Sequence, residues 1–239
     1  MSHAGDAGDV PDALVNLRDV ATAHACLRAG RLFRSDAPLP GDLTGREVPD
    51  WPPRLVLDLR DAAEKRHDHP YAALSEIVAL PILEGSMREH GGPPLGLADL
   101  YRAMVGGPAA SMLADAVSLI AAREGPVLVH CSAGKDRTGI TVALTLRLLD
   151  VDRDSIAADY ARTTEAMPLV LARLAATAGV RLDDPRMAEV PREVFEAPAH
   201  AIQEVLDVFD DHPGGAAGWF TAHGGDAAAI DALARRLLV

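Results

Sequence analysis

A cysteine and an arginine enclose five residues in a short polar stretch of this 239-residue chain. Cys131 opens the stretch and Arg137 closes it, and the small residues Ser132, Ala133 and Gly134 lie between them. If the chain turns here from a strand end into a helix start, several backbone N–H groups point inward at the positive end of the helix dipole. Small side chains let that backbone approach an anion closely. The spacing therefore predicts a basket that binds a phosphate dianion.

The two end residues of the stretch suit phosphoryl transfer. A helix N-terminus and a nearby arginine favour the ionised form of a thiol, so we expect Cys131 to be a thiolate at neutral pH. Attack of the thiolate on phosphorus divides hydrolysis into formation and breakdown of a phosphocysteine. The planar fork of Arg137 chelates two phosphoryl oxygens in a way that a lysine does not. We expect Thr138 to donate a hydrogen bond to the thiolate and His130 to orient the loop through its ring nitrogens.

Two carboxylates are candidates for the general acid that protonates the leaving oxygen. Asp136 lies inside the stretch beside Arg137, and Glu84 lies in a Gly/Pro-rich segment after the sequence Leu80-Pro81. We favour Asp136 because its place in the motif is certain, and we keep Glu84 as the alternative.

The residues on either side place the stretch between a strand and a helix. Residues 126–129 form a wholly apolar run, which is typical of a buried strand. From 137 to 149 the apolar residues follow helical spacing. The motif therefore belongs to a strand-loop-helix unit.

Further elements are predicted on both sides of that unit. Strands are predicted at residues 55–60 and 77–82, and helices at 109–124, 154–163, 167–179 and 198–210. The predicted class is α/β, with a central, mostly parallel sheet flanked by helices and a helical cap at roughly 151–213. Residues 1–10 are predicted to be a disordered leader, and 11–239 a single domain.

Charge and cysteine content exclude several classes of protein. The formal net charge is −12 and no basic stripe is present, so nucleic acid is not an expected partner. Two cysteines rule out a disulfide framework and a zinc site built from three or four thiolates. Neither a signal peptide nor a long apolar span is visible, which predicts a cytoplasmic location without stable membrane insertion. Signal-independent secretion would leave no trace in the sequence.

Several other polar residues receive structural interpretations. Cys26 lacks the context of Cys131 and is interpreted as a small buried hydrophobe. His67 and His69 have no third ligand nearby, so no metal and no cofactor are assigned. Asp58 and Arg60 are interpreted as an ion pair that supports the loop, with contact to substrate as the alternative.

The string from His130 to Gly139 resembles the signature loop of protein tyrosine phosphatases, Cys-x5-Arg-Ser/Thr. Its Gly-Lys-Asp-Arg-Thr core is similar to that of the atypical bacterial tyrosine and lipid phosphatases of the mycobacterial type. Four other segments resemble stretches of that family in the same order: Asn16–Val20, Gly30–Ser35, Asp58–Arg60 and Ala158–Tyr160. The resemblance covers roughly residues 14 to 235.

The resemblance implies an α/β fold with a helical lid, no metal, and activity on phosphotyrosine proteins or peptides that reaches phosphoserine and phosphoinositides. Oxyanions such as phosphate or vanadate are expected inhibitors. Lys135 favours the wider range, because a second phosphate on an inositol ring would meet its charge. The family typically carries an aspartate where this chain has Glu84. The residues expected to bind the phosphoryl group are His130, Ser132, Ala133, Gly134, Lys135, Asp136, Arg137 and Thr138.

Three alternatives remain open at this point. The first is a phosphatase whose main substrates are phosphoinositides. The second is a rhodanese-like sulfurtransferase that carries a persulfide on its loop cysteine, and the third is a non-catalytic phosphate-binding module. The run from Lys135 to Thr138 argues for phosphate over sulfur transfer. A binding module normally loses Cys131 or Arg137, and both are retained here.

Overall fold

A computed structural model of the chain describes residues 11–42, 48, 51–83, 96–179 and 192–239. Within them lies a five-stranded sheet in the order β1-β2-β5-β3-β4. The strands are β1 (Arg18–Asp19), β2 (Leu32–Ser35), β3 (Leu55–Asp58), β4 (Glu76–Ala79) and β5 (Val127–His130). The edge strand β1 is antiparallel and the other neighbours pair in parallel, so the prediction of a mostly parallel sheet is confirmed. The predicted leader, residues 1–10, lies outside the described residues.

The central strand β5 positions the cysteine. All four of its residues are buried, as an apolar run without alternation predicts for a strand covered on both faces. The register aligns His130 with Ser35 of β2 and with Asp58 of β3. Because the carboxyl ends of parallel strands meet at one edge of a sheet, Cys131 leaves β5 between the ends of its two neighbours.

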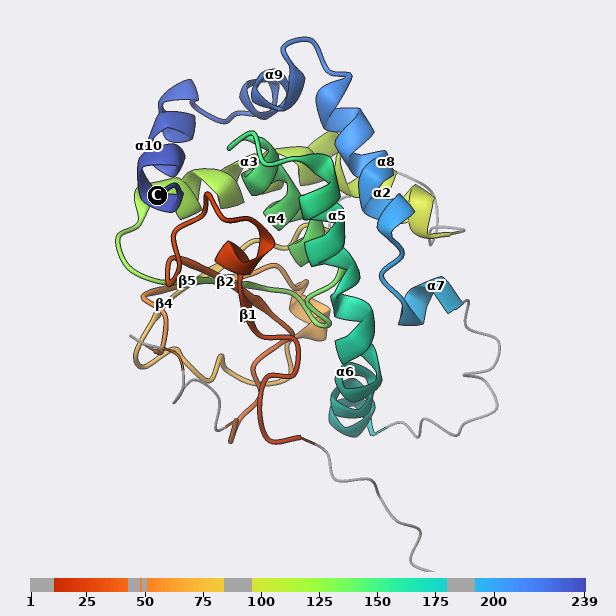
Figure 1. Cartoon of the computed structure of the whole chain (residues 1–239). Helices are drawn as coiled ribbons and strands as arrows, with labels where there is room; N and C mark the ends of the chain where they lie inside the picture. The colour runs from red at the N-terminus through yellow and green to blue at the C-terminus, as the bar shows by residue number, and fades with distance from the viewer. Residues whose placement is uncertain (1–10, 43–47, 49–50, 84–95, 180–191) are drawn as a thin grey trace, which may run out of the picture.

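Helices pack over one face of the sheet (Figure 1). Helix α4 (Asp136–Arg147) begins directly after the cysteine loop and is contacted by α3 (Gly107–Ala122), α5 (Arg153–Ala161) and α8 (Ala199–Asp210). The helices predicted at 109–124 and 137–149 therefore correspond to α3 and α4, and the α/β class is confirmed. Strand residues such as Leu57 and Val129 contribute to the main core beneath these helices.

The remaining elements complete the described chain. They are the helices α2 (Leu97–Met104), α6 (Thr163–Ala178), α7 (Arg192–Phe195), α9 (Gly215–Ala222) and α10 (Ala227–Leu237), and the 3-10 turns η1 (Val20–Ala23) and η2 (Ala62–Glu64). On the other side of the sheet, a smaller cluster forms around Phe33, Val56, Tyr71 and Leu128. Among the described helices none alone is long and apolar enough to cross a membrane, although α2 and α3 together meet that criterion with a 67° bend between them.

The segment expected to form a helical cap, residues 151–213, contains α5 to α8 in its described parts. Helices α5 and α8 pack against α4 and contribute to the main core. Helix α6 continues from α5 past the sheet, and α7 packs against α6 (Figure 1). Two of these helices are thus core elements, while α6 and α7 lie beside the loop end of the sheet.

Candidate active site

The loop after β5 packs tightly against the end of β2. Gly134 has a φ of +68°, and a Cβ built there would lie 2.3 Å from the carbonyl oxygen of Ser35. Glycine is therefore required at this position, both for its conformation and for the close approach of the two backbones. The amide of Ala37 adds a hydrogen bond of 3.0 Å to the carbonyl oxygen of Ser132. These contacts fix the loop to a parallel strand of the core.

Two side chains hold the loop from behind. Nδ2 of Asn16 donates to the carbonyl oxygens of Ala133 at 3.0 Å and Gly134 at 3.4 Å. Nη2 of Arg34 donates to the same Gly134 oxygen at 2.9 Å. Because N–H and C=O point in opposite directions in a trans peptide, the amides of Gly134 and Lys135 face the inside of the loop. A phosphate-binding loop requires this arrangement of backbone donors.

A buried ion network anchors Arg34. Its Nη1 lies 2.6 Å from Oδ2 of Asp159 in α5, and Nε of Arg18 lies 2.8 Å from the other carboxylate oxygen. Burial alone raises the pKa of Asp159, but the charges of Arg34 and Arg18 outweigh it and hold the pKa below its ordinary value. The network thus links α5, the edge of the sheet and the loop, which accounts for three of the segments that resemble the family.

Cys131 is 2% exposed at the start of the loop. Thr138, in the first turn of α4, is fully buried, and its hydroxyl has no hydrogen-bond partner within the described part of the chain. A buried hydroxyl without a partner is costly, so it requires a role. The expected hydrogen bond from Thr138 to a Cys131 thiolate remains a prediction.

The guanidinium of Arg137 is held by Glu64, the last residue of η2. Nη2 donates to Oε1 at 2.7 Å, and Nη1 donates to Oε2 and, at 3.3 Å, to the carbonyl oxygen of Leu59. The hydroxyl of Ser132 also donates to Oε1 of Glu64, at 2.6 Å. This partly buried pair favours the charged arginine, since the hydrogen bond to Glu64 outweighs the loss of water and raises the pKa of Arg137.

Asp136 is the first residue of α4, and it contacts two neighbours through Oδ1. The hydroxyl of Tyr101 donates to this oxygen at 2.8 Å, and Nζ of Lys135 lies 3.6 Å away. Burial, followed by the charge of Asp136, raises the pKa of Tyr101 well above its ordinary value. Tyr101 therefore stays protonated and acts as the donor.

Lys135 is almost completely buried, with 3% of its surface exposed. Its Nζ donates to the carbonyl oxygens of Glu193 at 2.9 Å and Glu196 at 3.0 Å, which lie in α7 and just after it. The ammonium group thus connects the loop to the segment that precedes α8.

A chain of hydrogen bonds runs behind the cysteine. Burial lowers the pKa of His69 to about 4 and that of His130 to about 3, so both rings are neutral at neutral pH. Nδ1 of His130 lies 3.0 Å from the carbonyl oxygen of Cys131 and must donate to it. Nε2 of His130 then accepts from Nε2 of His69 at 3.1 Å, and Nδ1 of His69 accepts from the amide of Tyr71 at 3.2 Å. One tautomer of each ring satisfies the whole chain.

Other predicted residues have the following positions. Nε and Nη2 of Arg60 each lie 2.9 Å from a carboxylate oxygen of Asp58, which is the ion pair expected at this strand end. Glu84, the alternative general acid, lies outside the described residues. Cys26 is half-buried, with Sγ 2.9 Å from Nδ1 of His24. Within the described ranges there is no group of three side chains suited to hold a metal ion.

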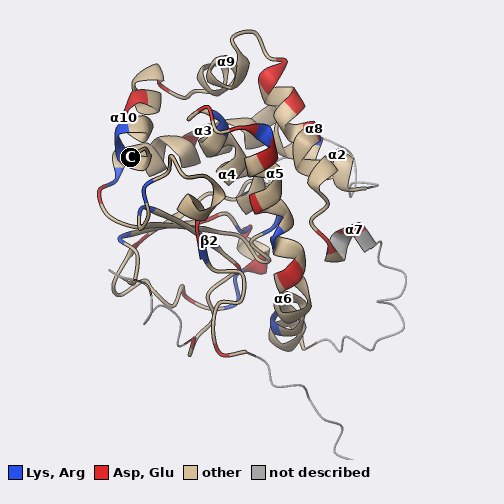
Figure 2. Cartoon of the chain, in the orientation of Figure 1, with Lys and Arg blue, Asp and Glu red and all other residues tan. Residues whose placement is uncertain are grey.

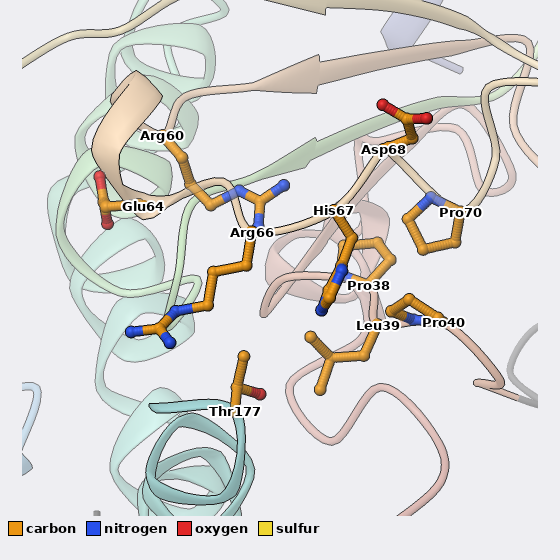
Figure 3. Close-up of a pocket in the computed structure, with 10 residues that line it drawn as sticks. All are labelled: Pro38, Leu39, Pro40, Arg60, Glu64, Arg66, His67, Asp68, Pro70 and Thr177. Atoms are coloured by element: carbon orange, nitrogen blue, oxygen red, sulfur yellow. The ribbon is translucent and has the colours of Figure 1, made fainter. Parts of the chain in front are cut away.

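A hollow lies beside the loop. One part, about 350 Å³, is lined among others by Ser132, Glu64 and Arg173. An adjoining part of about 290 Å³ shares Arg60 and Glu64 and is also lined by Arg66 (Figure 3). Acidic residues are spread over α5, α6 and α8 (Figure 2). The hollow itself carries both signs of charge, because Arg60, Arg66 and Arg173 line it together with Asp36, Glu64 and Asp68.

Four residues around the loop were not identified from the sequence: Asn16 as a loop ligand, Glu64, His69 and Tyr101. One local signal was available for Glu64. Asp61 and Glu64 form a capping box at η2, and the pattern of an acidic residue three positions after an N-cap is visible directly after the strand at 55–58. The pattern locates the turn, but the contact with Arg137 depends on the fold.

Comparisons with known proteins agree with this geometry. A model of the tyrosine phosphatase family matches residues 11–239. The chain is 31% identical over 209 residues to the triple specificity protein phosphatase PtpB of Mycobacterium tuberculosis, an alignment that covers 73% of this chain and 76% of the relative. It is also 31% identical over 170 residues to a putative tyrosine-protein phosphatase of Cupriavidus necator, covering 64% of this chain and 62% of that protein.

Proposed function

We propose that this chain, which belongs to the tyrosine phosphatase family, hydrolyses phosphotyrosine in proteins or peptides through a phosphocysteine intermediate on Cys131. The observation that carries this proposal is the loop between β5 and α4. Two of its amides face inward, and it runs from the buried Cys131 at the end of the central strand to Arg137 in the first turn of α4. Such donors stabilise the charge of a phosphoryl group in transit.

The reaction has two steps. In the first, the sulfur of Cys131 bonds to phosphorus as the bond to the leaving oxygen breaks, and that oxygen takes a proton from Asp136. In the second, water attacks phosphorus, its proton returns to Asp136, and the sulfur leaves as a thiolate. Arg137 binds the phosphoryl oxygens in both steps. Glu84 remains the alternative acid.

A wider range of substrates is part of the proposal. The relative from Mycobacterium tuberculosis is named a triple specificity phosphatase, and it aligns with most of this chain. We infer activity on phosphoserine, phosphothreonine and phosphoinositides, with phosphoinositide hydrolysis as the alternative main role. The two cysteines, neither in a disulfide, fit a reducing cytoplasm.

The experiment is phosphate release from a phosphotyrosine peptide, a phosphoserine peptide and phosphoinositides in the presence of a chelator, with wild type and Cys131→Ser compared. We expect the wild type to release phosphate and Cys131→Ser to release none. Trapping of phosphate on Cys131 by rapid acid quench would identify the intermediate. Full activity in Cys131→Ser would refute the mechanism.

Two results would favour the rival functions. Thiocyanate formation from thiosulfate and cyanide by the wild type, without phosphate release, would indicate a sulfurtransferase. Phosphopeptide affinity without any phosphate release would indicate a binding module.

A further inference from the structure

The hydrogen bonds of Arg137 leave one defined edge of its guanidinium open. A guanidinium has five N–H donors, one on Nε and two on each terminal nitrogen. Both hydrogens of Nη1 are used, by Oε2 of Glu64 and by the carbonyl oxygen of Leu59. Oε1 of Glu64 accepts the Nη2 hydrogen that lies next to Nη1. Nε–H and the second Nη2 hydrogen have no partner among the described residues.

These two remaining donors are parallel and lie on one edge of the plane. That is the pair that chelates two oxygens of a phosphoryl group. Glu64 and a phosphoryl group can therefore bind Arg137 together, on different edges. The carboxylate of Glu64 binds across the two terminal nitrogens, Nη1 and Nη2, and leaves the edge formed by Nε and Nη2 available to the phosphoryl group.

Glu64 is itself held by contacts on both sides. The amide of Asp61 donates to Oε2 at 2.9 Å, which closes the capping box of η2. The hydroxyl of Ser132 donates to Oε1 at 2.6 Å, so the carboxylate also touches the loop directly. Burial alone raises the pKa of Glu64, but the hydrogen bond and charge of Arg137 bring it down to about 2. The carboxylate is thus ionised over the whole range in which a phosphatase is assayed.

We infer that Glu64 is a positioning residue for the reaction. Its carboxylate fixes the rotation of the Arg137 guanidinium so that the Nε and Nη2 edge faces the phosphoryl group, and it fixes the Ser132 side of the loop at the same time. The inference rests on the proposed function, because it assigns Arg137 to phosphoryl binding. A long arginine side chain otherwise loses conformational entropy each time it chelates substrate, and a prebound carboxylate removes that loss.

The variant that tests the inference is Glu64→Gln, which keeps the length of the side chain but removes the charge. It also places an NH₂ group against the donors of Arg137. We expect kcat/KM for a phosphotyrosine peptide to fall about 10- to 100-fold, as for loss of a charged hydrogen-bonded pair. We expect the affinity for vanadate, measured by isothermal titration calorimetry, to fall with it. The matched control is Glu76→Gln, which removes the same charge from an exposed pair with Arg123 and should leave both values unchanged.

A second arm separates positioning from general damage. In an Arg137→Ala background, Glu64→Gln should cost several-fold less than it does in the wild type, because only the contact of Glu64 with Ser132 is left to lose. Equal losses in both backgrounds would overturn the inference. So would vanadate affinity that stays the same or rises in Glu64→Gln, since a rise would mean that the carboxylate competes for the anion site.

The oxyanion titration also keeps this test distinct from the proposed function. If Cys131→Ser retained full activity, the catalytic proposal would fail while vanadate binding still reported on Arg137. If wild type and Glu64→Gln have the same thermal unfolding temperature, a loss of affinity cannot come from unfolding. If Glu64→Gln unfolds at the assay temperature, it is replaced by Glu64→Asp, which keeps the charge but is one carbon shorter. A fall in vanadate affinity there would support positioning, and wild-type affinity would overturn it.

Discussion

The hydroxyl of Tyr101 donates a hydrogen bond of 2.8 Å to Oδ1 of Asp136. The hydroxyls of Tyr101 and Tyr160 are also in hydrogen-bond contact. Because Tyr101 has a single hydroxyl proton and directs it to Asp136, Tyr160 must donate to Tyr101. Two tyrosines thus orient the carboxyl group proposed as the general acid. One of its oxygens is occupied, which leaves Oδ2 to exchange a proton with the leaving group.

The first prediction concerns Asp136→Asn. An aryl leaving group with a stable phenolate needs little help from an acid, whereas the alkoxide of serine needs a proton. We expect kcat to fall about 100-fold or more with a phosphoserine peptide. With p-nitrophenyl phosphate, we expect the factor by which kcat falls to be at least about ten times smaller. Steady-state kinetics on the two substrates measures this ratio. Equal losses on both would transfer the acid role to Glu84.

Tyr101→Phe is the companion variant. It keeps the ring in the core and removes only the donor to Asp136. We expect a smaller loss, about three- to tenfold in kcat, with the same dependence on leaving group. A loss that does not depend on the leaving group would mean that Tyr101 supports the fold and does not orient the acid.

The second prediction concerns Gly134→Ala. Alanine at φ +68° is strained, and its Cβ would lie 2.3 Å from the backbone oxygen of Ser35. We expect a loss of more than about 2 kcal/mol in the free energy of unfolding, together with loss of vanadate binding. Gly30→Ala is the matched control, because Gly30 has φ +76° and no heavy atom near its Cβ position. That control should cost about 1 kcal/mol and leave activity intact.

The sequence predicted those parts of the site that are local in the chain. Cys131 and Arg137 are brought together by one strand-loop-helix unit, so spacing and hydrophobic periodicity were sufficient to place them. The parts that were missed depend on contacts between distant segments. Asn16 reaches the loop from 117 residues away and His69 reaches His130 from 61 residues away. Nothing in the local pattern of either segment indicates that contact.

The resemblance to a family identified more of the segments that support the loop than hydrophobic periodicity did. Two of the similar segments supply Asn16 and Arg34, which bind the loop carbonyls, and a third supplies Asp159, which holds Arg34. The segments therefore belong to one supporting network. Sequence comparison recognised the pieces, and the fold shows that they act on the same loop.

The third prediction concerns pH and His69. Its pKa falls from 6.5 in the unfolded chain to about 4 in the folded protein, because burial disfavours the charged ring. The unfolded chain therefore binds more protons between these values, and stability is lost as the pH falls from about 6.5 toward 4. His69→Gln should reduce the slope of unfolding free energy against pH by up to about 1.4 kcal/mol per pH unit near pH 5 to 6. Urea denaturation at several pH values measures the slope.

His67→Gln is the control for that measurement. His67 is exposed, two residues away in the same segment, so its replacement should leave the slope unchanged. Asp36, a buried carboxyl group whose pKa is raised by burial, contributes to the slope of every variant and cancels in the comparison. If His69→Gln and wild type have parallel stability profiles, the neutral His69–His130 pair is not the source of acid sensitivity.

The last prediction concerns Lys135, whose ammonium group is bound to the carbonyl oxygens of Glu193 and Glu196. To meet a second phosphate on an inositol ring, it must exchange these neutral acceptors for an anionic one, which forms the stronger hydrogen bond. Lys135→Met keeps the length of the side chain without the charge. We expect it to lower kcat/KM about tenfold more for a phosphoinositide with two phosphates than for one with a single phosphate.

The two phosphoinositides share a headgroup and a lipid surface, so their ratio isolates the second phosphate. A phosphotyrosine peptide adds a third comparison, because its single phosphate occupies the loop alone. If Lys135→Met lowers all three rates by the same factor, the ammonium group acts by joining the loop to the segment after α7, and the charge has no part in substrate choice. In that case the proposed activity on phosphoinositides would lose its support from Lys135.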